Sequence, residues 1–528
     1  MNKNMEKYTS MSPFELKNVL IDMAEKSAKK KNKEMLNAGR GNPNFLNTTT
    51  REAFCFLNFF ATDLASKNTK IKDLGLRPEK KGIAKKLNTF LDKKKNDATT
   101  LLKKSIAYCI KELKLNPDDV VFELADASLG DFYPSPPRIF PNTEKIVFEY
   151  LNQVLFNGKL SRQGKFQLFA NEGATASMVY TFKSLKENCI LNKGDAIAII
   201  TPIFSPYLEI PELNDYQLVE VYIEGDEEKG WQIPDSEIKK LENKKIKALY
   251  FVNPTNPTSV ALNKETLEKI EKLVRTKRKD LIALTDTVYA TFPKQFNSIV
   301  GVIPKNTICV YSYSKYFGVT GWRLGVIMLH EDNVIDKLIK NLPKKEILRL
   351  DKRYKMDSAT PEKIKFIDRL EMDSRDVALA HTGGLSCPQQ CMMSLLSLFE
   401  LLDKQKKYKK SIQSILEKRI DDLYKNLKVK LEKGPEHTYY YTLLNLGEMA
   451  KDQYGQNFAN YLTKNFTAID FLFRLAKEKY TICLPGQGFA GPKWSIRIAL
   501  ANLPDKAYPT IGKNIKTIMD QYYKEWKK

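Results

Sequence analysis

The chain has 528 residues, of which 42% are hydrophobic, enough for one large core and a second, smaller one. Lysine and arginine outnumber aspartate and glutamate by 86 to 63, a formal net charge of +23. No apolar run approaches the roughly 18 residues that cross a bilayer. The charged start of the chain is also unlike a secretory signal. We therefore expect a cytoplasmic protein without a membrane partner.

The positive charge is spread along the whole chain in short lysine runs, and no zinc, helix-turn-helix or RNA-binding motif accompanies it. This distribution argues against a nucleic-acid partner, while the positive field favours an anionic small-molecule substrate. The seven cysteines are scattered, and Cys387 and Cys391, one helical turn apart, lack partner ligands. We predict reduced thiols and no metal site.

The first 150 residues are predicted to form an N-terminal arm, part of a small domain and a helical insertion. Apolar residues recur at helical spacing within 1–35 and again across 50–125. Two loops interrupt the helices. One is the glycine-containing stretch 36–45, and the other is 130–137, which three prolines make rigid.

Between about 150 and 330, strand and helix patterns alternate, and the apolar face of a helix is visible at 264–275. The alternation predicts an α/β fold with a mostly parallel sheet covered on both faces. Ligands of such sheets bind beyond the carboxyl ends of the strands. The expected strands lie near residues 166–170, 196–201, 218–223, 246–252, 280–285 and 306–313.

Residues 331–380 are charged and helix-leaning, and we expect them to form a second insertion. The section from about 386 begins with a helical pattern and ends in strands and helices. We therefore expect a large domain at 151–345, followed at 346–528 by a helical insertion and a smaller α/β domain.

The most informative stretch follows the last expected strand. It contains Ser312 and, three residues later, Lys315, then Gly318, Gly321 and Arg323. This string closely resembles the cofactor-lysine segment of the fold-type I pyridoxal-phosphate enzymes, the aspartate aminotransferase superfamily. The resemblance implies a seven-stranded type of sheet and pyridoxal 5'-phosphate as cofactor. It makes Lys315 the catalytic lysine that forms the Schiff base, with Ser312 and Arg323 on the cofactor phosphate.

Two strand ends resemble other cofactor contacts of the same superfamily. The turn Gly173-Ala174-Thr175 opens a helix, where backbone N–H groups and a hydroxyl suit an anion. On the resemblance, these three residues form the phosphate cup. Phe204, two residues after Pro202, stands where the superfamily stacks an aromatic side chain on the pyridine ring.

Two further strand ends complete the expected cofactor site. Residues 253–259 resemble the superfamily's Asn-Pro-x-Asn-Pro-Thr-Gly string, with Ser259 in place of the last glycine. The resemblance implies that Asn256 bonds the cofactor's phenolic oxygen and touches the substrate carboxylate. Asp286 would keep the pyridine nitrogen protonated, so that the ring accepts electrons. Tyr289 would also bond the phenolic oxygen.

Other residues match superfamily positions for the substrate or for a second subunit. Arg497, after a Pro-Gly-x-x-Phe turn, would hold the substrate α-carboxylate in a bidentate pair. Gly39 would contact the substrate, and Arg40 is an extra cation suited to a dicarboxylate. Tyr133 is expected to reach the cofactor phosphate of the partner subunit.

Residues 11–17, 36–46 and 130–134 resemble the aspartate 4-decarboxylase family, and that resemblance extends over nearly the whole chain. It implies β-decarboxylation of L-aspartate to L-alanine and carbon dioxide. It also implies a side aminotransferase activity with a 2-oxo acid such as 2-oxoglutarate. Members of this family assemble dimers further, so we expect a homodimer within a larger homo-oligomer.

Two alternatives remain open from the sequence alone. One is an ordinary class I aspartate or aromatic aminotransferase, because the fold alone does not fix the reaction. The other is a binding protein on a catalytically dead aminotransferase fold. The intact set Asn256, Asp286, Lys315, Arg323 and Arg497 speaks against the second alternative.

Overall fold

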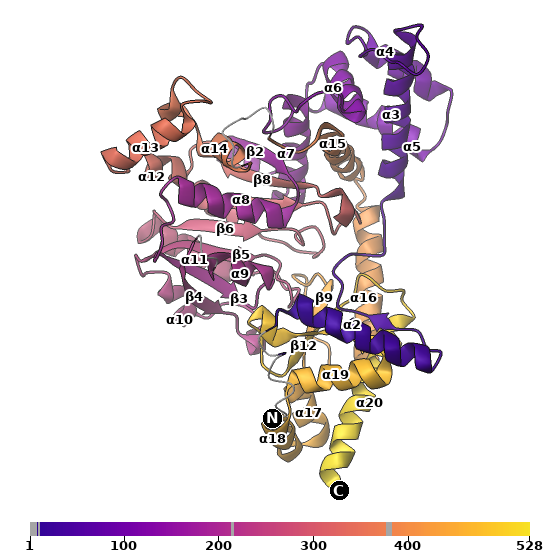
Figure 1. The fold of residues 1–528 in the computed structure, drawn as a ribbon, viewed down its shortest axis with the longest axis vertical. Helices are drawn as coiled ribbons and strands as arrows, with labels where there is room; N and C mark the ends of the chain where they lie inside the picture. Colours follow the sequence, from indigo (N-terminus) through magenta and orange to yellow (C-terminus); the bar gives the residue numbers. More distant parts are fainter. Residues whose placement is uncertain (1–7, 9–10, 213–215, 376–382) are drawn as a thin grey trace.

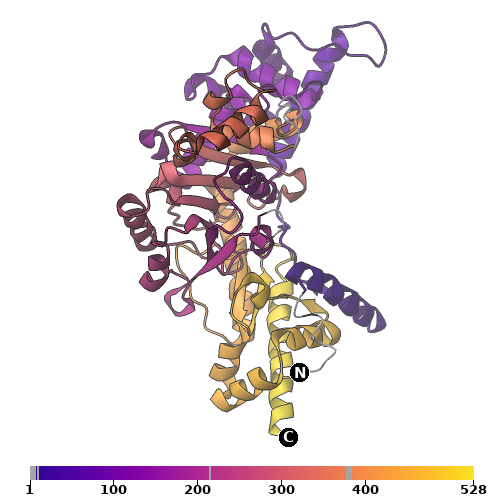
Figure 2. The same ribbon diagram turned by 60° about the vertical axis from the view of Figure 1, so that its left-hand side comes forward.

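The computed structural model describes residue 8 and residues 11–212, 216–375 and 383–528. Figures 1 and 2 show three regions stacked along the long axis: a helical region, a sheet with its helices, and a smaller region that contains the C-terminus. Within the described residues, no helix is both long and apolar enough to cross a lipid bilayer. The expected arm at 1–35 is a helix, α2 (Pro13–Lys30), which begins at the N-cap Ser12; residues 1–7, 9 and 10 lie outside the description.

The helical pattern predicted at 50–125 corresponds to a separate helical region with its own core. Its helices pack against α15, which arrives from much later in the chain. Cys387 and Cys391 of α15 are buried in this core, so they act as small apolar side chains. The bounds are α3 (Thr48–Lys67), α4 (Ile83–Asp92), α5 (Asp97–Lys111), α6 (Pro117–Leu129) and α15 (Cys387–Leu402).

The central sheet has seven strands in the order β2-β8-β7-β6-β5-β3-β4, and only β8 runs antiparallel to its neighbours. All six predicted strands are present, within two residues of the expected bounds. The seventh, β8 (Gly325–His330), was not predicted, because its short apolar run follows directly on the lysine motif. The other bounds are β2 (Phe166–Asn171), β3 (Ala196–Thr201), β4 (Val219–Glu224), β5 (Ile246–Val252), β6 (Ile282–Asp286) and β7 (Thr307–Ser312).

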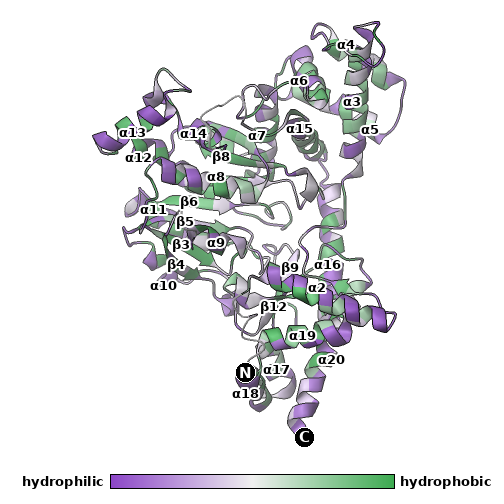
Figure 3. Ribbon diagram, in the orientation of Figure 1, coloured by the Kyte–Doolittle hydropathy of each residue, from purple (hydrophilic) through white to green (hydrophobic). Residues whose placement is uncertain are grey.

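Helices cover both faces of this sheet. Every residue of β3, β6, β7 and β8 is buried, and successive side chains of a strand point to opposite faces, so neither face is open. Figure 3 shows the apolar strands inside and mixed helices around them. This arrangement confirms the predicted α/β class. The covering helices are α7 (Pro141–Phe156), α8 (Ala174–Glu187), α9 (Pro206–Glu212), α10 (Asp235–Lys240) and α11 (Lys264–Thr276).

The segment after β8 folds back onto the sheet region through α12 (Val334–Lys340), α13 (Lys344–Tyr354) and α14 (Phe366–Asp373). Helix α14 packs on α8 and β2. The buried Asp373 carboxylate accepts hydrogen bonds from Ser184 and Asn188 of the α8 end and from Tyr354 of α13. The last part of the insertion expected at 331–380, from residue 376 on, lies outside the described residues.

The smaller region combines the end of the chain with its beginning. Strands β11, β12 and β9 form an antiparallel sheet, and β10 pairs with β1 (Leu36–Asn37). Helix α2 packs on α19, β10 and β11, so the N-terminal helix belongs here. The bounds are α16 (Lys407–Leu427), β9 (Tyr441–Asn445), α17 (Leu446–Tyr454), α18 (Gln456–Asn465), α19 (Ala468–Lys479), β10 (Thr481–Ile482), β11 (Leu484–Pro485), β12 (Ser495–Ala499) and α20 (Ala507–Lys527).

Candidate active site

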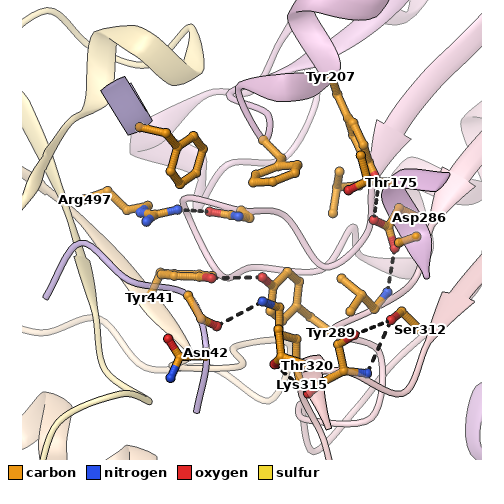
Figure 4. A pocket seen from close by; sticks show the side chains of 18 of the residues that line it. Asn42, Thr175, Tyr207, Asp286, Tyr289, Ser312, Lys315, Thr320, Tyr441 and Arg497 are labelled. Carbon is orange, nitrogen blue, oxygen red and sulfur yellow. Dashed lines mark hydrogen bonds between the residues drawn. The ribbon is translucent and has the colours of Figure 1, made fainter. Parts of the chain in front are cut away.

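A cavity of about 290 Å³ lies where the carboxyl ends of the sheet strands meet the smaller region. Ten of the residues predicted from the sequence line it (Figure 4). They come from the sheet region and from the smaller region, so the cavity forms only when these two regions pack together. The ten are Ala174, Thr175, Phe204, Asn256, Asp286, Tyr289, Ser312, Lys315, Arg323 and Arg497.

Lys315 extends into this cavity from the turn after β7. Its Nζ donates a hydrogen bond to the backbone oxygen of Gly41, 3.0 Å away, in the loop that follows β1. Poor solvation of the ammonium form lowers the pKa of Lys315, and the positive charges of Arg497 and Arg323 lower it further. The lysine is therefore prepared to act as a neutral amine.

Asp286 ends β6 and is buried. Its Oδ2 accepts from the Tyr207 hydroxyl at 2.8 Å, and its Oδ1 accepts from the backbone N–H of Val288 at 2.9 Å. Burial raises the pKa of Asp286 from near 3.8 to about 6, against the opposing effect of these two bonds and of Lys315. Such a carboxylate is stabilised by any positively charged group that enters the cavity.

Another part of the cavity lining is suited to an anion. Helix α8 begins at Ala174 with no side-chain cap, so the N–H groups of its first turn are open. Arg323 donates to the backbone oxygens of Thr320 at 2.7 Å and Glu172 at 3.1 Å, which fixes its guanidinium beside this helix start. Gly173 has a φ of 101°, which L side chains rarely adopt, and a Cβ there would stand 2.8 Å from Arg323 Nη2, so this turn favours glycine.

Arg497 projects from β12 with its guanidinium among aromatic rings. The Cζ atom lies 4.5 Å from the ring centre of Tyr441 and 4.8 Å from that of Phe489. Its Nη2 donates to the backbone oxygen of Gly39 at 2.8 Å, and its Nη1 donates to Asn256 Oδ1 at 3.3 Å. Among the described residues, none accepts a hydrogen bond from the buried Nε. A buried arginine with a spare donor suits a carboxylate ligand.

Four predicted residues lie outside the cavity lining. Gly173 immediately precedes the start of α8, beside Arg323. Gly39 touches the site only through its backbone oxygen on Arg497. Arg40 is exposed beside Lys17, whose pKa is lowered by burial and then by the charges of Arg40 and Arg497. Tyr133 is 68% exposed in the loop between α6 and α7.

Sequence reasoning missed several residues that the fold brings into the cavity. Tyr207 and Tyr441 bring hydroxyls to Asp286 and Tyr289, and Phe14 reaches the cavity from α2. Gly41 accepts the Lys315 hydrogen bond. Tyr207 had a usable signal, because it follows the same strand end as Phe204, and Gly41 and Phe14 lie in the stretches 36–46 and 11–17 that the sequence singled out. Tyr441 had no such signal.

The donor set fits pyridoxal 5'-phosphate, a flat aldehyde with a ring nitrogen at one end and a phosphate at the other. The lining brings together a buried carboxylate, an open helix start with an arginine beside it, and the lysine. Phe204 and Asn256 lie on the same lining. The lining therefore offers a partner for each end of the cofactor and an amine for its aldehyde.

Comparison with known proteins agrees with this geometry. The model of the family described as aminotransferase class I and II matches residues 175–511. The bifunctional aspartate aminotransferase and L-aspartate β-decarboxylase of a Pseudomonas species is 41% identical, and the match covers 100% of this chain and 99% of that protein. An aspartate aminotransferase of Sulfurisphaera tokodaii is 25% identical, over 57% of this chain and 62% of that one.

Solved structures show the same fold. Aspartate aminotransferase from Thermus thermophilus with maleate gives a TM-score of 0.58 at 15% identity, covering 96% of both chains. Aromatic aminotransferase from Pyrococcus horikoshii gives 0.56 at 18% identity, covering 96% of this chain and 99% of that one. The chain therefore belongs to the class I and II aminotransferase family, whose members use pyridoxal 5'-phosphate.

Proposed function

We propose that the protein is a pyridoxal-phosphate-dependent aspartate β-decarboxylase that converts L-aspartate to L-alanine and carbon dioxide. Aspartate aminotransferase activity with a 2-oxo acid such as 2-oxoglutarate accompanies it. The observation that carries this proposal is the end-to-end similarity to the Pseudomonas bifunctional enzyme. That similarity includes α3–α6, which lie outside the segment matched by the general aminotransferase model.

Residues at both ends of the cavity hold the cofactor in this proposal. Gly173, Ala174, Thr175, Ser312 and Arg323 bind the phosphate, supported by the uncapped start of α8. Asp286 takes the ring nitrogen, and Phe204 packs on the ring. Asn256 and Tyr289 bond the phenolic oxygen. When bound, pyridoxal 5'-phosphate supplies an aldehyde for the substrate amine and a ring that accepts electrons.

Lys315 moves protons in the proposed reaction. Its lowered pKa favours the neutral amine, which takes the proton from the substrate Cα and returns it later. Without a ligand, burial raises the pKa of Asp286 and favours its neutral form. A protonated ring nitrogen beside it would favour the ionised carboxylate instead. Lys315 thus acts as the base, and Asp286 acts as the counter-ion of the ring nitrogen.

Arg497 binds the α-carboxylate of the substrate through its Nε and Nη groups. The backbone of Gly39 supports it from the neighbouring loop. Arg40, at the rim beside Lys17, orients the β-carboxylate without enclosing it. A loosely held β-carboxylate is lost more readily, because tight pairing would stabilise the charged ground state.

A product assay with aspartate as the only substrate tests this function. The purified protein is loaded with pyridoxal 5'-phosphate and incubated with L-aspartate alone. We expect continuous release of alanine and carbon dioxide in equal amounts. An ordinary aminotransferase would instead stop after one turnover per site and release oxaloacetate, and that result would exclude the decarboxylase.

We further propose a cytoplasmic homodimer that assembles into larger homo-oligomers. The exposed position of Tyr133 supports a role at the phosphate of a second copy, since that side chain does not line its own cavity. Exposed apolar side chains on and after α3 offer contacts for further assembly. These are Phe59, Ile71, Leu74 and Leu76.

A further inference from the structure

Tyr441 occupies a position that none of the cofactor or substrate roles above uses. It opens β9 in the smaller region, is 2% exposed and lines the cavity. In the register of the antiparallel pair, Arg497 of β12 faces Leu443. Tyr441 lies two residues before Leu443 on β9, so it is the diagonal neighbour of Arg497 on the same face of the sheet.

The guanidinium of Arg497 lies over the ring of Tyr441. The guanidinium carbon stands 4.5 Å from the ring centre, the shortest of its three aromatic contacts. A guanidinium stacked on a ring keeps its donors free in its own plane. The ring therefore fixes the plane in which Arg497 presents its donors to a carboxylate.

The hydroxyl of Tyr441 lies at the other end of the site. It accepts a hydrogen bond from the hydroxyl of Tyr289 at 3.1 Å. A Cβ placed on Gly41 would be 2.7 Å from this hydroxyl and 3.5 Å from Lys315 Nζ, so both groups border the same small space. One side chain thus connects the carboxylate-binding arginine with the lysine and its neighbouring phenol (Figure 4).

Ser259 anchors Tyr441 to the sheet region. The Ser259 Oγ accepts a hydrogen bond from the backbone N–H of Tyr441 at 2.8 Å, and its backbone oxygen accepts one from the backbone N–H of Thr438 at 2.8 Å. This serine has a φ of 64°, a conformation that favours glycine. The residue that departs from the superfamily string therefore supplies the bond that sets the start of β9.

We propose that Tyr441 is a positioning residue with two separable parts: its ring orients Arg497 for the substrate α-carboxylate, and its hydroxyl strengthens the hydrogen bond that Tyr289 gives to the cofactor. This inference rests on the proposed binding of the cofactor at Lys315. It does not depend on which bond of the substrate is then broken.

The direction of the hydroxyl effect follows from donor and acceptor roles. In the structure Tyr289 donates to Tyr441. With the cofactor bound, Tyr289 would instead donate a hydrogen bond to the phenolic oxygen and accept one from Tyr441, because a phenol hydroxyl can both donate and accept. A phenol that accepts a hydrogen bond is a stronger donor. Removing the Tyr441 hydroxyl should therefore weaken the stabilisation of the ionised phenolic oxygen and raise the pH at which the bound cofactor's visible band changes.

Other ionisable groups around this pair stay in place in the experiment. They are Lys315 after β7, Asp286 on β6, Arg323 before β8, Tyr440 next to β9 and Arg497 on β12. Because the variants below leave all five unchanged, a difference in the pH midpoint reports on Tyr441.

Three variants separate the two parts. Tyr441→Phe keeps the ring and removes the hydroxyl, and Tyr441→Leu removes both. Tyr424→Phe is the matched control, because its buried hydroxyl bonds Thr442 Oγ1 at 2.6 Å on the other face of the same strand. Each is measured for the pH midpoint of the visible band in the cofactor-loaded protein. Each is also measured for maleate affinity by calorimetry, with and without cofactor.

We expect Tyr441→Phe to raise the midpoint by about half a pH unit while its maleate affinity stays within about twofold of wild type. Tyr441→Leu should raise the midpoint similarly and lower maleate affinity about tenfold. Tyr424→Phe should change neither quantity.

A Tyr441→Phe midpoint equal to that of Tyr424→Phe would overturn the hydroxyl part, and wild-type maleate affinity in Tyr441→Leu would overturn the ring part. Neither readout requires turnover. If wild-type protein releases no alanine from aspartate but the midpoints shift as expected, the proposed reaction fails and the role of Tyr441 stands.

Discussion

Burial gives the charged side chains of this site their chemistry. Asp286 and Arg497 are both almost fully buried, and Lys315 is partly withdrawn from water. Loss of solvation raises the pKa of Asp286 and lowers the pKa of Lys315 and of Arg497, and each shift favours the neutral form of the group. Groups held this way cost stability in the free protein and become useful only when a ligand of opposite charge arrives.

Asp286 should make the stability of the cofactor-free protein depend on pH. Its pKa is raised to about 6 in the folded state, so the folded state holds this proton more tightly than the unfolded chain does. The stability that Asp286 contributes is therefore fully present below about pH 4 and is lost as the pH rises through 6, by up to about 3 kcal/mol. Asp286→Asn removes this loss. In thermal melts, the melting temperature of the variant relative to wild type should be higher at pH 7 than at pH 4.5.

A difference in melting temperature between Asp286→Asn and wild type that is the same at pH 4.5 and pH 7 would contradict this account. Contributions from other titrating groups cancel in the comparison, because the two proteins differ at one side chain.

Arg497→Lys should weaken substrate binding more than it slows the chemistry. A lysine loses both the paired hydrogen bonds and the stacking on Tyr441, so we expect the KM for aspartate to rise about 10- to 100-fold. Steady-state kinetics with the loaded enzyme measure this. Arg278→Lys is the control: Arg278 is equally buried but bonds only Asp280 and backbone oxygens around β5. It should lower thermal stability and leave KM unchanged.

At the scale of single elements, the sequence predicted the strands well because each is a short apolar run with a clear end. It missed β8, whose apolar residues follow a motif without a break, and the two-residue strands β1 and β10, which periodicity cannot reveal. The polar residues at strand ends were found because parallel strands bring their carboxyl ends together. Tyr441 was not found, because it starts an antiparallel strand whose register no local pattern fixes.

Ser259 provides a test at this scale. Ser259→Ala loses the acceptor for the Tyr441 N–H but keeps a Cβ at a φ of 64°. Ser259→Gly loses the same acceptor and relieves the backbone. We expect the alanine variant to be less stable than wild type by about 1–2 kcal/mol and the glycine variant by less than about 1 kcal/mol. Denaturant titration compares them, and equal losses would show that the backbone at 259 is unstrained.

At the scale of the whole molecule, the site depends on two regions that are far apart in the chain. Asn256, Asp286 and Lys315 come from the sheet region, whereas Arg497 and Tyr441 come from the smaller one. The sequence indicated which residues matter through motif order and predicted that the first 150 residues contribute part of the small domain, but it could not show that α15 joins α3–α6. Those contacts arise from long-range packing, which leaves no local periodicity.

Assembly is testable through the exposed apolar side chains that follow α3. Ile71 and Leu76 are 65% and 52% exposed, and burying them between copies would stabilise an oligomer. We expect light scattering to give at least twice the mass of one chain. The double change Ile71→Lys and Leu76→Lys should reduce the mass toward that of a dimer. Val219→Lys, equally exposed on the edge strand β4, should not. A mass unaffected by the double change would remove this surface from the interface.

The central claim is that Lys315 carries the cofactor between Asp286 and the start of α8. Treating the loaded protein with borohydride fixes any lysine-bound pyridoxal phosphate, and peptide mass analysis then locates it. The account predicts the added mass on the peptide that contains Lys315 and none in Lys315→Ala. Attachment to a different lysine, or no attachment in a protein that still shows activity, would contradict it.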